Sequence, residues 1–200
     1  DTTELINGLE YAQVSEGLQV PPGMYTLEVK QNDDGPTVDF VTTPDMQAGR
    51  AYFAIATGFV AGAEPGFQAL AFEEGFILDP TMALARVVHA SPDAPAVDVG
   101  VIDEMGFAPV PDFQDLMFGE ASSSAGTALP TLPLVIGLAT PPGSTDVAVR
   151  FELGPYEGMR AFVVAAGSLL GQGEPLELLL IDTADAPWQV IRIPALPEDS

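Results

Sequence analysis

The feature that most constrains the fold of this chain is an internal repeat. Residues 50–65, RAYFAIATGFVAGAEP, match residues 160–175, RAFVVAAGSLLGQGEP, without a gap and 110 residues further along. Two shorter blocks keep the same order: residues 20–30 match residues 140–150 around a Pro-Pro-Gly turn, and residues 9–15 match residues 116–122. Three ordered matches predict two homologous units, residues 1–80 and residues 81–200.

Short strands are expected within each unit. Val147, Val149, Phe151 and Leu153 alternate with more polar residues, a period of two that places one face of a strand on a core. The runs AYFAIATG and AFVVAAG are apolar on both faces, as central strands are. Glycine and proline, 20 and 19 of the 200 residues, fall between such runs, and VPDFQDLMFGE offers one helical turn at most. We therefore expect an all-β chain of two tandem immunoglobulin-like antiparallel β-sandwich domains.

The two predicted units differ at their beginnings. The second opens with RVVHASPDAPAVDVG, residues 86–100, and the repeat spacing places the counterpart of this segment before Asp1. A sandwich that lacks its opening hairpin leaves an apolar face and a sheet edge uncovered. We expect the first unit to be completed by residues that precede Asp1 or by another chain.

The end of the chain offers a strand for that purpose. Aligning residues 189–200 with residues 83–95, with one gap between Ile193 and Pro197, places Arg192 on Arg86, Ile193 on Val87, Pro197 on Pro92 and Glu198 on Asp93. The predicted assembly strand is Val190, Ile191, Arg192 and Ile193, inserted into a groove of the next molecule between residues 5–11 and 25–29. Arg86 and Arg192 are expected to pair with acidic neighbours and fix its register. The result is head-to-tail self-association. The alternative, which Pro194 favours, is that these residues form the last edge strand of the second unit.

The charge balance excludes several classes of partner. Twenty-nine acidic residues against six basic ones give a net charge of −23, which argues against nucleic-acid binding and against anionic membranes. The absence of cysteine excludes disulfides and thiolate metal sites, and no apolar run is long enough for membrane insertion. A strongly anionic surface is tolerated best where salt or divalent cations screen it, as in brine or outside a cell; the alternative is a generically soluble acidic protein.

His89, the only histidine, is the obvious candidate for catalysis. It lies near Ser91, Asp93 and Asp98, but no G-x-S-x-G elbow or second triad supports a hydrolase. We interpret these four residues as a structural turn motif, in which SPDAP folds residues 87–90 back on residues 97–99 and brings His89 to Asp98. No catalytic residue, and no enzyme activity, is predicted.

Two further kinds of ligand are candidates, calcium and a glycan. Asn32, Asp33, Asp34 and Asp39 give one loop the oxygen ligands that calcium prefers, although the EF-hand spacing is absent and an exposed Asp-Gly hairpin explains it as well. No other cofactor is expected. The candidate glycan-binding aromatics are Tyr11, Tyr25, Tyr52, Trp188 and the loop residue Tyr156; most of them lie in predicted strands, where aromatic side chains usually pack internally.

The segment RVVHASPDAPAVDV closely resembles the hallmark of the DUF4397 family, and residues 21–29, PPGMYTLEV, resemble a later element of that family. The match is weaker in the second copy, where Ser144, Thr145 and Asp146 replace the usual residues. The resemblance implies an exported, often tandem immunoglobulin-like module and supplies no catalytic residue. Together these features lead us to expect an extracellular or cell-surface filament or surface-layer subunit; the alternative is a secreted module that binds a glycan or protein.

Overall fold

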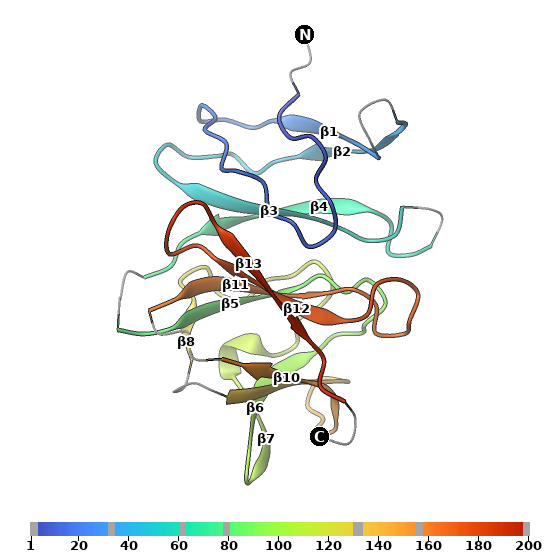
Figure 1. Cartoon of the computed structure of the whole chain (residues 1–200), viewed down its shortest axis with the longest axis vertical. Coiled ribbons are helices and arrows are strands. Elements are labelled where there is room, and N and C mark those ends of the chain that lie inside the picture. Colours follow the sequence, from blue (N-terminus) through green and yellow to red (C-terminus); the bar gives the residue numbers. More distant parts are fainter. Residues whose placement is uncertain are drawn as a thin grey trace.

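The protein is described by a computed structural model that covers residues 4–31, 35–60, 63–77, 81–129, 134–154 and 158–197. These residues form strands joined by turns, with one short 3-10 turn at Pro111–Phe113 inside the segment where the sequence allows one. The prediction of an all-β chain is confirmed. Figure 1 shows the strands stacked in layers along the long axis of the molecule.

The second unit is a sandwich of two sheets. One contains β13 (Gln189–Pro194), β12 (Glu177–Asp182), β11 (Arg160–Ala166), β5 (Leu84–His89) and β8 (Thr127–Ala128), in that order. The other contains β10 (Val147–Leu153), β9 (Leu134–Ala139), β6 (Asp98–Asp103) and β7 (Gly106–Pro109). Alternate side chains of both sheets meet in one core, which includes Phe113, Phe151 and Leu180, each at most 2% exposed.

Two details of the predicted second unit are wrong. Strand β5 pairs with β11 in parallel, from Leu84 beside Arg160 to His89 beside Ala165, so the sheets are not wholly antiparallel. Residues 86–100 do not form a hairpin either, because β5 and β6 lie in different sheets. The SPDAP turn carries the chain across the sandwich. Strand periodicity is the same for both arrangements, which is why the sequence did not distinguish them.

The first unit is smaller. Strands β1 (Thr26–Lys30) and β2 (Thr37–Thr42) form one antiparallel hairpin, and β3 (Ala51–Thr57) and β4 (Gln68–Glu74) form another. Strand β2 has no counterpart among the described residues of the second unit, where the chain passes from β10 to β11 without an intervening strand. Each described strand of the first unit pairs with only one other strand, because both of its sheets are two-stranded.

The β3–β4 hairpin packs on the outer face of the five-stranded sheet (Figure 1). A second apolar cluster fills this contact, with Phe53, Phe72 and Phe76 on one side and Phe162, Val164 and Ile181 on the other. The rings of Phe53 and Phe162 stack with their centroids 4.7 Å apart. The five-stranded sheet is thus buried on both faces, which accounts for the two-sided apolar pattern of β11.

The repeat is visible in the structure, but with a spacing of 109 residues through β3 and β4. The pair Phe53–Phe72 corresponds to the pair Phe162–Ile181, and Gly58 corresponds to Gly167, each with a positive φ at the end of its strand. The gapless spacing of 110 is therefore wrong by one residue here. The error matters because a shift of one residue moves a side chain to the other face of the sheet.

Candidate assembly site

The inner face of the β3–β4 hairpin, which points away from the second unit, is open along β3. Ala54 and Ala56 are exposed, whereas their counterparts Val163 and Ala165 are buried in the sandwich core. Large apolar side chains of the first unit are exposed as well: Leu5, Ile6, Leu9, Tyr11, Leu18, Val20, Met24 and Phe40. A contiguous patch of exposed apolar side chains is typical of an interaction surface.

The hairpin also has open hydrogen-bonding edges. In the second unit β11 lies between β5 and β12, and β12 lies between β11 and β13. Their counterparts β3 and β4 pair only with each other among the described strands. In the second unit β5 occupies one edge of β11. No described strand occupies the equivalent edge of β3. An unpaired strand edge is a template for another strand.

The turn that flanks β5 in the second unit has a counterpart in the first unit. In the second unit the backbone N–H of Glu120 donates to the Met117 carbonyl at 3.0 Å, and the N–H of Met117 donates to the Glu120 carboxylate at 3.0 Å. In the first unit Gln13 and Glu10 make the same two bonds, at 3.2 and 3.1 Å. The matched turns are built alike, which supports the alignment of residues 9–15 with residues 116–122.

In the second unit this turn and the residues after it form hydrogen bonds with the edge of β5 that faces away from β11. The N–H of His89 donates to the Glu120 carbonyl at 2.9 Å, and the N–H of Ser122 donates to the Val87 carbonyl at 2.9 Å. The Ser122 hydroxyl accepts from the N–H of Val87, also at 2.9 Å. Ser15 is the counterpart of Ser122 in the first unit.

The predicted assembly strand lies in its own chain. All six residues of β13 pair antiparallel with β12, so Val190, Ile191, Arg192 and Ile193 form the edge strand that the sequence left as the alternative. The guanidinium of Arg192 donates two hydrogen bonds to the Glu177 carboxylate, at 2.9 and 2.7 Å, and lies 5.7 Å from the ring centre of Tyr11. Partial burial and the nearby Glu177 carboxylate raise the pKa of Tyr11 to about 12.

The predicted groove differs from the one observed. A depression of about 350 Å³ lies in the N-terminal segment, lined by residues 5–9, 13–16 and 18. Residues 25–29 do not line it; Thr26–Lys30 form β1 and pair with β2.

His89 belongs to the structure of the second unit. Its side chain is 1% exposed, its Nε2 is 3.0 Å from the Pro95 carbonyl, and Phe118 meets the ring edge-on. Burial lowers the pKa of His89, so the ring is neutral and Nε2 donates to the carbonyl. The expected contact with Asp98 is wrong: the Asp98 carboxylate accepts from the N–H of Asp115 at 2.8 Å and of Gly143 at 2.7 Å.

Asp93 ties the SPDAP turn to the loop between β11 and β12. Its carboxylate accepts from the hydroxyl of Ser168 and from the backbone N–H of Leu169 at 2.8 Å and Leu170 at 3.2 Å. The Ser91 hydroxyl donates to it more weakly, at 3.4 Å. Burial raises the pKa of Asp93, but these hydrogen bonds together lower it below the ordinary 3.8. Ser91, Asp93 and the β11–β12 loop form a structural clamp.

We expect Asp93→Asn to lower the free energy of unfolding by about 1–2 kcal/mol at pH 7, because charge-assisted bonds are lost at a partly exposed site. A depressed folded-state pKa gives stability above the unfolded pKa that is lost as the pH falls through the folded value. The difference between wild type and variant should therefore shrink below about pH 4 in urea titrations. A difference that is constant down to pH 2.5 would contradict this role of the carboxylate.

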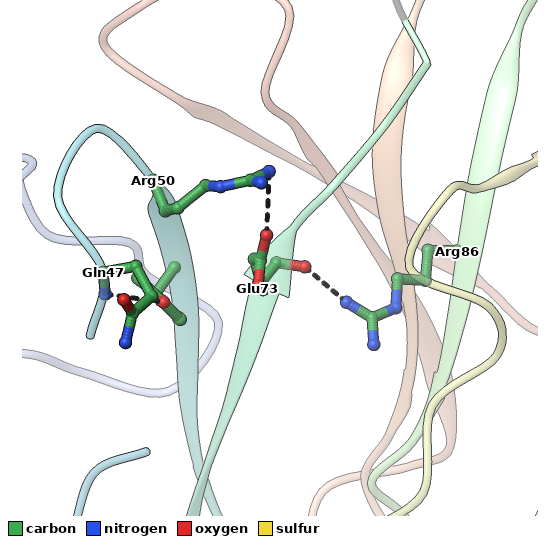
Figure 2. Close-up of polar contacts among 5 residues, drawn as sticks. Gln47, Arg50, Glu73 and Arg86 are labelled. Carbon is green, nitrogen blue, oxygen red and sulfur yellow. Dashed lines mark hydrogen bonds and ion pairs between the residues drawn. The ribbon is translucent and has the colours of Figure 1, made fainter. Parts of the chain in front are cut away.

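Arg86 sits at the contact between the two units (Figure 2). Its side chain is buried, with Nη1 donating to the Glu73 carbonyl at 2.6 Å and Nε donating to the Ser122 carbonyl at 2.9 Å. The guanidinium lies 5.3 Å from the ring centre of Phe72 and 5.6 Å from that of Phe162. Arg86 thus contacts backbone of both units. The sequence predicts a carboxylate partner for Arg86, but its guanidinium donates to backbone carbonyls instead.

The other candidate ligand sites receive less support. Asp33 and Asp34 lie outside the described residues, and Asp39 lies in β2, where its carboxylate accepts from the N–H of Phe40. Among the described residues no group of three or more metal-ligating side chains comes together. Tyr52 accepts from the N–H of Gln47, Tyr25 donates to the Pro21 carbonyl and Trp188 packs near Phe53, so these aromatics are engaged internally. Tyr156 is outside the described ranges.

The fold and the site define an all-β protein with one closed sandwich and one open, apolar-faced unit attached to it. A family model described as a domain of unknown function (DUF4397) matches residues 1–100, and the chain belongs to that family. The match includes the segment 86–100 that carries the resemblance. It also crosses the predicted boundary between residues 80 and 81.

No curated protein and no solved structure matches this chain. In the portion of the chain that the structure describes, no helix is long and apolar enough to cross a membrane.

Proposed function

We propose that this chain is a structural protein of the cell surface or extracellular medium, whose first unit is completed by a β-strand from another polypeptide. The observation that carries the proposal is the contrast between equivalent positions: Ala54 and Ala56 of β3 are exposed beside an open edge, whereas Val163 and Ala165 of β11 are buried in a strand that has a neighbour on each side. Strand addition to such an edge joins subunits through main-chain hydrogen bonds.

The charge of the chain is consistent with this setting. Subunits with a net charge of −23 repel one another at low ionic strength. At about 1 M salt the screening length falls to roughly 3 Å, which leaves short-range strand pairing intact while removing the long-range repulsion. Assembly should therefore increase with salt.

A single charge on the uncovered face tests the proposal. We expect Ala54→Lys to abolish salt-dependent oligomers, because the lysine would be trapped in the interface when a strand covers this face. The measurement is light scattering after gel filtration, with electron microscopy of the large species. The melting temperature should change little, since Ala54 is exposed in the single chain.

Met105→Lys is the matched control. Met105 is 94% exposed at the tip of the β6–β7 hairpin, away from the open edge. Its lysine variant should assemble like wild type. A wild-type chain that stays monomeric from low to high salt would contradict the proposal and would favour a secreted binding module.

A further inference from the structure

The chain contains an example of the strand transfer that the proposal requires. Strand β5 follows β4 in the sequence, yet it pairs with β11 of the next unit and has no ladder with β4. Strand β13 follows β12 in the same way, and within one chain it turns back to pair with β12. The two strands hold equivalent places in the repeat, and Arg192 aligns with Arg86.

We propose that the strand that completes the first unit is β13 of a second copy, bound in parallel beside β3 as β5 is bound beside β11. This inference rests on the proposed function and names its partner. It also implies that β13 has two alternative sites, antiparallel to β12 in a free chain and parallel to β3 in an assembly. An exchange of this kind joins molecules head to tail.

The second unit specifies the register. Leu84 pairs with Arg160, Arg86 with Phe162 and Val87 with Val163 along the parallel ladder. The repeat transfers these pairs to Val190 beside Ala51, Arg192 beside Phe53 and Ile193 beside Ala54. In this register Ile193 covers the exposed Ala54, and Arg192 lies over the Phe53 side of the sheet.

The other edge of the inserted strand also finds partners. The N–H and carbonyl of Val87 bond to the hydroxyl and N–H of Ser122, and the Arg86 Nε donates to the Ser122 carbonyl. Ile193 and Arg192 would make these three bonds to Ser15. In this register Pro194 takes the place of Val88, and it lacks the N–H that a continued ladder requires, so the inserted strand ends at Ile193.

Leaving β12 has a definite cost. Release of β13 exposes Ile193, which is 7% exposed in the core of the second unit, and breaks the Arg192–Glu177 pair. The parallel site offers equivalent burial of Ile193 and new hydrogen bonds for Arg192. The two sites therefore offer Ile193 similar burial and Arg192 similar hydrogen bonding. Exchange between molecules should then depend on protein concentration.

Disulfide trapping tests the register, because the chain has no cysteine of its own. We expect an equal mixture of Ala51→Cys and Val190→Cys chains to form interchain disulfides under mild oxidation, since directly paired strand residues are close enough for the bond. The control mixture is Thr26→Cys with Val190→Cys, because Thr26 is exposed on β1 outside the proposed site. The control should give only background crosslinking.

A second variant locks the strand in its own chain. Asp182 and Gln189 are paired residues of β12 and β13, so Asp182→Cys with Gln189→Cys should form an intrachain disulfide. The oxidised form should lose its oligomers, and reduction should restore them.

The outcomes separate the two proposals. Oligomers that persist in the locked form, or oligomers without the Ala51–Val190 crosslink, would overturn the role of β13 while leaving strand addition by another segment in place. A wild-type chain without any oligomers would overturn both. Crosslinking of the Ala51 and Val190 mixture together with loss of assembly on locking is the expected result.

Discussion

Phe162→Ala should lower the free energy of unfolding by about 3–5 kcal/mol, the range for deleting a buried aromatic side chain. Phe162 is fully buried in the middle of β11. Its ring stacks on Phe53 and meets Phe76 edge-on at 5.5 Å, so one side chain contacts two parts of the first unit. The substitution removes a large apolar group and leaves a cavity that the two flanking layers cannot easily close.

The effect should extend to the attachment of the first unit. Phe162 and Phe53 are equivalent residues of the two hairpins, and their contact is at the centre of the cluster that joins them. In the variant, amide hydrogens of β3 and β4 should exchange with solvent faster than those of β6 and β9, because the second unit keeps its separate core. Equal acceleration in all strands would indicate one cooperative unit instead.

Phe40→Ala provides the matched control for this prediction. Phe40 lies in β2 and is 63% exposed, so the same change of residue type removes little buried surface. Chemical denaturation of both variants should give a loss in stability for Phe162→Ala and a change within about 0.5 kcal/mol for Phe40→Ala. Similar losses would contradict the assignment of Phe162 to the joint.

The elements that the sequence predicts well are those set by local pattern. Alternation at Val147 to Leu153 identifies β10, and the Pro and Gly turns separate the strands. The repeat predicts that the strands of one unit recur in the other, and the matched turns at Glu10 and Met117 show how closely. Both features depend on neighbouring residues, which a single sequence displays directly.

The elements that the sequence does not predict depend on partners far along the chain. A strand with apolar residues on both faces fits a parallel or an antiparallel neighbour, so β5 could not be assigned to β11 from its pattern. Asp93 is recognisable as a turn residue, but the N–H groups it binds lie 76 and 77 residues away. The spacing of 109 residues, in place of 110, became clear only from the ladder and the matching loops.

The candidate site shows the same division. The sequence predicts that the first unit is short of strands, and the exposed Ala54 and Ala56 agree with an uncovered face. The cover over the opposite face comes from the second unit of the same chain, which the sequence did not reveal. Ser15 was missed as well. The signal available for it was the serine that ends both matched blocks, residues 9–15 and 116–122.

Arg86→Met should lower the free energy of unfolding by about 2–4 kcal/mol, because it removes the charged donor from one buried and one partly buried carbonyl. The methionine fills much of the volume between Phe72 and Phe162, so the loss reports mainly on the guanidinium bonds to Glu73 and Ser122. Burial lowers the pKa of Arg86 and the Glu73 carboxylate opposes this effect.

Arg50→Met is the control, because Arg50 contacts the same residue in a different way (Figure 2). Its Nη1 lies 3.0 Å from the Glu73 carboxylate, and the two side chains are 57% and 38% exposed. An exposed pair of this kind contributes at most about 1 kcal/mol, and salt screens it further. Urea unfolding in low and high salt should therefore show a small, salt-sensitive loss for Arg50→Met and a large, salt-insensitive loss for Arg86→Met. Losses of equal size would mean that Arg86 does not join the units through the Glu73 backbone, and that apolar packing alone holds the first unit in place.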